Sequence, residues 1–140
     1  MTNLSNDPMP IVVPGWARPH GYSDGMQGRG RVLVTAGVIG WNPATQQVES
    51  DNFASQVAQC LRNIVTILEA ARAEPRHLVR LTWYVTNRDE YIGARQSIGL
   101  AYREVLGRHY PVMAVVVVAG LLEPRAKVEI EAMAIVPDPE

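Results

Sequence analysis

The chain has 140 residues, 47% of them hydrophobic, which suits one domain over residues 1–140 with a single buried core. Its formal net charge of -1, without any basic cluster, argues against a nucleic-acid partner and against attraction to an anionic membrane surface. The single cysteine cannot form an internal disulfide, and we find neither a membrane-spanning apolar run nor a signal peptide, so we expect a soluble cytoplasmic protein.

The N-terminal part predicts an extended segment followed by a β-hairpin. We expect residues 1–15 to be extended. Residues 21–30 are rich in glycine and the mostly β-branched run 32–35 follows, so a turn near 27–30 would join two strands. Glycines then end the second strand, and a loop follows.

A helix is predicted from Asp51 onward, because the apolar residues there recur at intervals of three or four. They are Phe53, Val57, Leu61, Ile64, Leu68 and Ala71. Ser50 or Asp51 is available as the N-cap, and Pro75 is expected to end the helix.

The second half of the chain predicts a strand, a helix and two further strands. Residues 78–85 alternate loosely as a strand does, and Asn87 or Asp89 would cap a second helix. The buried stripe of that helix is expected to comprise Tyr91, Ala94, Ile98, Ala101 or Tyr102, and Val105. Residues 113–118 are then apolar on both faces, whereas residues 127–134 alternate strictly.

The expected order is β-β-α-β-α-β-β, an α+β fold with a single-layer mixed sheet. Right-handed strand–helix–strand crossovers would place both helices on one face of this sheet. The other face of the apolar run 113–118 must then be hidden from water by something else. With no third helix expected, the simplest cover is another copy of the chain, and we predict a cyclic homo-oligomer.

Several short motifs occur in a fixed order along this framework. They are Ala36-Gly37-Val38-Ile39-Gly40, Asn63-Ile64, Leu68-Glu69-Ala70-Ala71, Tyr110-Pro111 and Val128-Glu129-Ile130-Glu131-Ala132. In this order and at these spacings the chain resembles the RidA (YjgF-like) family of reactive enamine and imine deaminases over residues 22–136. The resemblance implies a chorismate-mutase-like fold, a homotrimer with a central barrel, and a small-molecule cleft at each subunit interface without a cofactor.

The same resemblance assigns residues to the cleft. As the catalytic residue it would use Glu129, which in relatives is taken to orient the water that attacks the imine carbon. The expected substrate-binding residues are Tyr22, Ala36, Gly37, Gly99, Met113 and Val115. A simpler interpretation is that Glu129 and Glu131 are the solvated face of a half-exposed strand.

The chain departs from the family pattern inside this cleft. The family deaminases have an arginine where this chain has Met113, and that arginine holds the substrate carboxylate in a bidentate pair. A thioether offers no charge, and losing such a buried pair costs about 2–5 kcal/mol in binding. Ala36 also replaces the usual serine, and Gly99 stands where many relatives have asparagine. We therefore expect a substrate that differs from 2-aminoacrylate.

Other side chains are candidates for the mouth of the cleft. Trp41 follows Gly37 closely, and Trp16 or Trp83 could also line a pocket, although packing explains each at least as well. Arg18, with His20 nearby, or Arg125 could replace the lost cation, although a surface role is the commoner one. His77 and His109 lack a second ligand at metal spacing, so no metal is expected, and Cys60 is expected to be a small buried side chain.

Three functions remain open from the sequence. The first is a hydrolytic deaminase of an enamine or imine. The second is a non-catalytic homotrimer that binds a small molecule. The third, a ribonuclease or translation inhibitor, is disfavoured because phosphate contacts dominate such binding and the chain carries no basic stripe.

Overall fold

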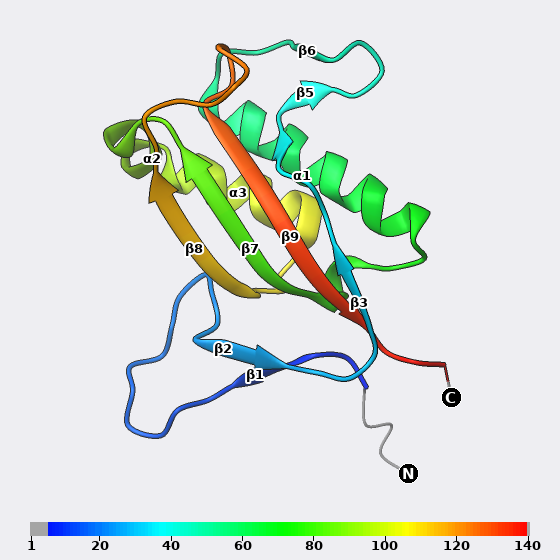
Figure 1. Cartoon of the computed structure of the whole chain (residues 1–140). Coiled ribbons are helices and arrows are strands. Elements are labelled where there is room, and N and C mark those ends of the chain that lie inside the picture. Colours follow the sequence, from blue (N-terminus) through cyan, green and yellow to red (C-terminus); the bar gives the residue numbers. More distant parts are fainter. Residues whose placement is uncertain (1–5, 140) are drawn as a thin grey trace.

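Residues 6–139 are described by the structure, a computed structural model, in which helices cover one face of a mixed sheet (Figure 1). The strands are β1 (Met9–Ile11), β2 (Gly25–Gln27), β3 (Arg31–Val34), β4 (Val38–Ile39), β5 (Trp41–Asn42), β6 (Gln47–Val48), β7 (Leu78–Val85), β8 (Val112–Val117) and β9 (Val128–Val136). The main sheet has the order β3-β9-β7-β8, and β4 pairs with β9 beyond the end of β3. The β7–β8 pair is parallel and the others are antiparallel, which confirms the predicted α+β class.

Helix α1 (Phe53–Ala70) packs its predicted apolar stripe against the sheet, and Val57, Leu61 and Ile64 are fully buried. Its N-cap is Asn52, whose Oδ1 accepts a hydrogen bond from the Ser55 amide at 2.9 Å, so the predicted cap was wrong by one or two residues. The helix ends before Pro75. The chain turns at Arg72, which has a φ of 57°, and Pro75 begins a 3-10 turn, η1 (Pro75–His77).

The predicted second helix is divided into α2 (Arg88–Gly93) and α3 (Arg95–Leu106). Asn87 caps α2 as predicted, because its Oδ1 accepts from the Glu90 amide at 2.8 Å. The interruption at Ala94 directly follows Gly93, a residue with low helix propensity. Most of the predicted stripe nevertheless packs on the core, with Ile98 and Tyr102 buried.

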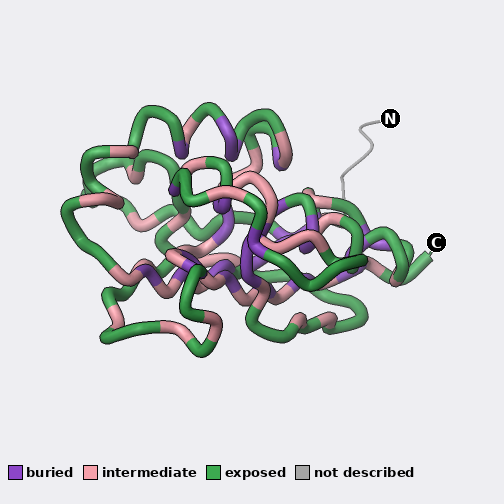
Figure 2. The backbone as a smooth tube through the Cα atoms, turned by 90° about the horizontal axis from the view of Figure 1, so that it is seen from above, coloured by how far each residue is buried: buried purple, intermediate pink, exposed green. Residues whose placement is uncertain are grey.

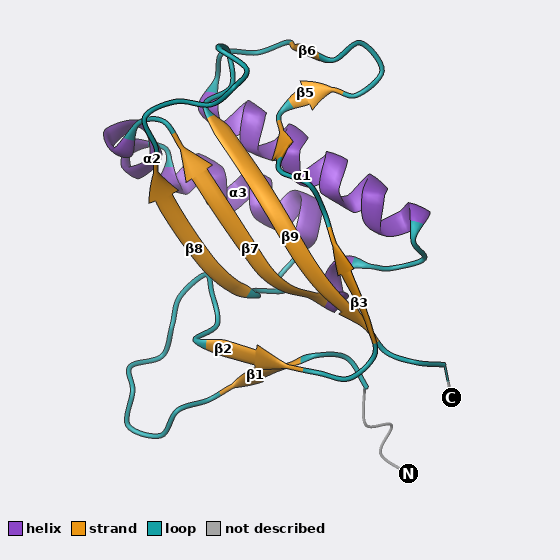
Figure 3. Ribbon diagram, in the orientation of Figure 1, coloured by secondary structure: helices purple, strands orange, loops and turns teal. Residues whose placement is uncertain are grey.

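The predicted N-terminal hairpin is wrong. β2 pairs with β1, and Figure 3 shows this ribbon beside the lower end of the main sheet. β3 pairs with β9 instead of β2. Gly30 accounts for the change of direction, since it has a φ of +146° and a Cβ there would lie 1.9 Å from the Val136 carbonyl oxygen. Residues 1–5 of the expected extended segment lie outside the described residues.

The two faces of the sheet differ in what covers them. Buried segments lie in the middle of the molecule, where helices meet sheet, and the peripheral loops are exposed (Figure 2). β9 alternates strictly between buried and half-buried residues, as predicted. On the face away from the helices, Val32, Val34 and Val116 are 63%, 65% and 42% exposed. This outer face therefore carries apolar side chains that no other part of residues 6–139 covers.

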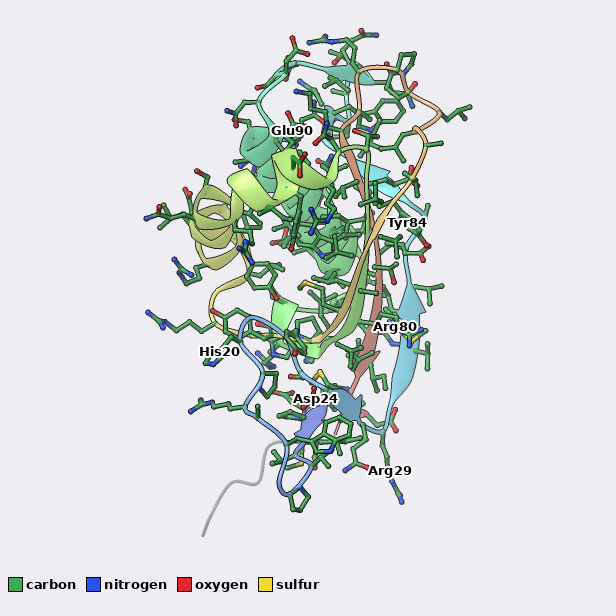
Figure 4. All side chains as sticks on the ribbon, turned by 90° about the vertical axis from the view of Figure 1, so that its left-hand side faces the viewer. His20, Asp24, Arg29, Arg80, Tyr84 and Glu90 are labelled. Carbon is green, nitrogen blue, oxygen red and sulfur yellow. The ribbon has the colours of Figure 1, made fainter. Side chains whose placement is uncertain are left out.

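Polar side chains occupy the middle of the outer face. Figure 4 shows Arg80 and Tyr84 projecting from β7 on the side away from the helices. The Tyr84 hydroxyl donates a hydrogen bond to Glu131 at 2.8 Å. No helix within residues 6–139 is both long and apolar enough to cross a membrane.

Gly40 provides a test of the contact between β4 and α1. A Cβ at Gly40 would lie 2.4 Å from the Gln56 carbonyl oxygen, which is backbone and cannot move aside cheaply. We expect Gly40→Ala to lower the free energy of unfolding by about 2 kcal/mol or more. Gly93→Ala is the control, because among residues 6–139 no atom beyond its chain neighbours and its own helix backbone lies within 4 Å of its Cβ position. It should leave stability unchanged or raise it by up to about 1 kcal/mol. Urea unfolding of both variants measures this, and equal effects would contradict the close approach.

Candidate functional site

Glu129 lines a cavity of about 460 Å³ at the β4 edge of the sheet, here called the Glu129 cavity. Gly37 and Trp41 line the same cavity, so the structure brings together three residues expected from the sequence. A Cβ at Gly37 would lie 2.7 Å from the Glu129 carboxylate, so glycine lets the carboxylate lie directly against this turn. Sequence analysis missed a second carboxylate in the lining, Glu123.

Buried amides of α1 hold the backbone around this cavity. Asn63 Nδ2 donates to the carbonyl oxygens of Ile39 at 3.3 Å and Trp41 at 2.9 Å. Gln56, which is 1% exposed, donates from Nε2 to the Ser50 carbonyl at 2.9 Å and accepts the Lys127 amide at 2.8 Å. Because buried polar groups are costly when unpaired, these contacts fix the loops on both sides of Glu129.

A second cavity of about 370 Å³, here called the Met113 cavity, lies on the helix side of the sheet at the β8 edge. Four of the residues expected to bind substrate line it: Tyr22, Gly99, Met113 and Val115. Met113 stands opposite the buried Leu81 in the β7–β8 register and faces the helices. No residue lines both cavities, so within one chain the expected site is divided into two halves at opposite edges of the sheet.

The remaining expected residues lie outside both halves. Ala36 is exposed beside Gly37 and lines neither cavity. Arg18 lines a third cavity, of about 640 Å³, which adjoins the Met113 cavity through Tyr22. Arg125 is placed away from both halves, because it forms an ion pair with Asp51 at 3.0 Å and donates to the Val48 carbonyl.

Two cations in the Met113 cavity were missed by the sequence reasoning. Arg95 and Arg103 of α3 line it together with His20. The spacing could have indicated them, because Arg95 and Arg103 each lie four residues from Gly99 and share one helix face with it. The cavity lined by Met113 therefore has two arginines, both from α3.

The remaining titratable candidates are structural. Burial raises the pKa of the Cys60 thiol, the nearby Glu129 carboxylate raises it further, and Sγ donates to the Val38 carbonyl at 3.3 Å. His77 Nδ1 accepts the Glu74 amide at 3.0 Å, and His109 Nε2 lies 2.7 Å from the Leu78 carbonyl oxygen. Across residues 6–139 no three His, Cys, Asp or Glu side chains are grouped to hold a metal ion.

Fold and cavities together define an α+β protein with ligand-sized cavities at two edges of one sheet. The family model described as Endoribonuclease L-PSP matches residues 16–136. The chain is 31% identical over 109 residues to the 2-iminobutanoate/2-iminopropanoate deaminase of Escherichia coli K12, covering 76% of this chain and 80% of that one. It is 33% identical over 121 residues to a RutC family protein of Sinorhizobium fredii, covering 86% and 90%.

A solved structure gives the same result. A Rid family protein of unknown function from Yersinia pestis superposes with a TM-score of 0.82 at 27% identity, covering 93% of this chain and 99% of that one. The chain belongs to the RidA/YjgF family.

The burial of Cys60 predicts a dependence of stability on pH. In the unfolded chain the thiol ionises near its ordinary pKa of about 8.5, whereas in the folded chain it stays neutral. The contribution of the neutral Cys60 thiol to the free energy of unfolding is therefore complete below about pH 8. It is lost as the pH rises further, by at most about 1.4 kcal/mol per pH unit. Urea unfolding between pH 7 and 9.5 should show this decline in the wild type and less of it in Cys60→Ala. Equal declines would refute the assignment.

Proposed function

We propose that this protein is a cytoplasmic hydrolytic deaminase of an enamine or imine, working in a cleft between copies of a homotrimer. The observation that carries the proposal is the Glu129 carboxylate, which lies over Gly37 in a cavity large enough for a small molecule. The name of the E. coli relative at 31% identity, and of a human relative at 28%, is 2-iminobutanoate/2-iminopropanoate deaminase.

The chemistry asked of Glu129 is general acid–base catalysis. The substrate enters as a protonated imine, and the Glu129 carboxylate accepts a proton from water while the water oxygen adds to the imine carbon, which gives a carbinolamine. Glu129 then passes this proton to the nitrogen. The C–N bond breaks as the carboxylate takes the proton of the carbinolamine hydroxyl, a carbonyl compound and ammonia leave, and the ammonia carries the last proton away as ammonium. Proton transfer by one positioned side chain contributes about 10²–10⁴-fold to such a rate.

A ring of copies would join the two halves of the site. The Glu129 cavity lies at the β4 edge and the Met113 cavity at the β8 edge, so a head-to-tail contact places one beside the other. The exposed apolar side chains on the outer face, Val32, Val34 and Val116, supply the surface that such a ring would bury. Each cleft would then take Glu129 from one copy and Met113 from the next.

The identity of residue 113 argues for a substrate other than 2-aminoacrylate. A structure of the relative TdcF from E. coli, 26% identical with a TM-score of 0.66, was solved with bound serine. In this chain the Met113 thioether cannot pair with the carboxylate of such a ligand. The same change supports a second candidate function, a trimer that binds a small molecule without turning it over.

Glu129→Gln separates the two functions. We expect ammonia release from a panel of imines and enamines to fall by about 10²-fold or more, because the amide cannot accept the proton, while ligand affinity changes little. Glu131→Gln is the matched control, since Glu131 lies on the same strand and bonds Tyr84. If no imine is hydrolysed above the uncatalysed rate by the wild type, the binding function replaces the deaminase.

Mixed assemblies test whether the cleft is shared. Met113→Glu puts a charge into the Met113 cavity and should inactivate the protein alone, as Glu129→Gln does. Refolding the two variants together in equal amounts should restore about a quarter of the wild-type turnover, because a quarter of the clefts in a mixed ring receive both intact halves. No recovery, with both variants folded and assembled, would place the site within one chain.

A further inference from the structure

The Met113 cavity has an unbalanced positive charge that the proposed reaction does not use. Arg95 and Arg103 line it with His20, and the described lining contains no carboxylate. Among residues 6–139, neither arginine takes part in an ion pair. Burial raises the pKa of Tyr91, and the positive charge of Arg95 lowers it. The Arg95 guanidinium therefore lies near the Tyr91 ring. The cavity is therefore suited to an anion.

The wall of the cavity is aromatic. Four of the five tyrosines line it together with Trp83. Tyr102 and Tyr110 are stacked with ring centroids 5.5 Å apart, and Trp83 meets Tyr91 edge to face at 6.4 Å. Because these rings pack on one another and on the core, the wall is largely preformed for a flat apolar group.

Trp83 adds an unused donor to this wall. Its side chain is 1% exposed, and Nε1 has no hydrogen-bond acceptor among the described residues. A buried indole N–H without an acceptor is unfavourable, and Trp83 is one of the residues that line the Met113 cavity. This observation is independent of the two arginines.

Gly99 makes room for one of the cations. A Cβ at this position would lie 3.3 Å from Arg103 Nη1, so the guanidinium lies over the glycine on the face of α3 that lines the cavity. Glycine inside a helix costs about 1 kcal/mol relative to alanine. Gly99 therefore lowers the stability of α3 at the point where the Arg103 guanidinium lies.

We propose that the Met113 cavity binds an aromatic carboxylate, with its ring against the aromatic wall that includes Trp83 and its carboxylate at Arg95 and Arg103. The two arginines of α3 are then the residues that determine specificity, in place of a cation at position 113. The inference rests on the proposed function only in taking this cavity as the substrate-binding half of the cleft.

Phenylacetate is the probe, with phenylacetamide as its neutral counterpart and acetate as the anion without a ring. By calorimetry, we expect phenylacetate to bind at least about tenfold more tightly than either. Arg95→Gln and Arg103→Gln should each weaken its binding about tenfold. Arg62→Gln, which removes an exposed arginine from α1 and lies outside the lining, should leave it unchanged.

A spectroscopic readout tests the role of Trp83. Its indole N–H resonance, assigned by its absence in Trp83→Phe, should shift on addition of phenylacetate. Equal affinity for phenylacetamide, unchanged affinity in both arginine variants, or an unmoved Trp83 resonance would each overturn the inference. Phenylacetate binding that persists in Glu129→Gln, without turnover of any imine by the wild type, would refute the deaminase and leave this inference standing. Imine turnover that neither arginine variant changes would refute this inference and leave the deaminase standing.

Discussion

Buried amides on α1 hold the loops on which the rest of the site depends. Asn63 donates to two carbonyls of the β4–β5 segment, and Gln56 bonds the segments before α1 and before β9. Both side chains are almost inaccessible to water, so any loop movement would leave buried donors unpaired. The backbone beside Glu129 is thus set by hydrogen bonds from a helix and does not depend on a ligand to order it.

The alternation of strand β9 places Glu129 on the face of the sheet opposite to the one that Met113 faces. Its strict alternation turns Val128 and Ile130 into the core and leaves Glu129 half-buried on the other face. Met113 faces the helices because β8 is in register with the buried side of β7. A single chain therefore cannot present both groups to one ligand.

Hydrophobic periodicity predicted the helix faces and the strands well, because burial of one face is a local pattern. The N-terminal hairpin was wrong because strand pairing is decided by distant contacts, here the approach of Gly30 to the Val136 carbonyl. Of the expected site residues, Gly37, Trp41 and Glu129 meet in one cavity and Met113 lines another. Arg95 and Arg103 escaped notice since charges on an amphipathic helix resemble solvated surface, and only the fold shows what that surface lines.

The composition of β8 has a consequence for the unassembled chain. This strand has the sequence Val-Met-Ala-Val-Val-Val and lies at the edge of its sheet, where it pairs along its length with β7 and meets Ser23 at a single bridge from Val112. It contains no charge or proline, the devices by which natural sheets keep other chains from adding to an open edge. Such a segment is prone to aggregate when exposed. Association into a ring that covers β8 would protect newly made chains from forming cross-β aggregates, independently of any catalysis.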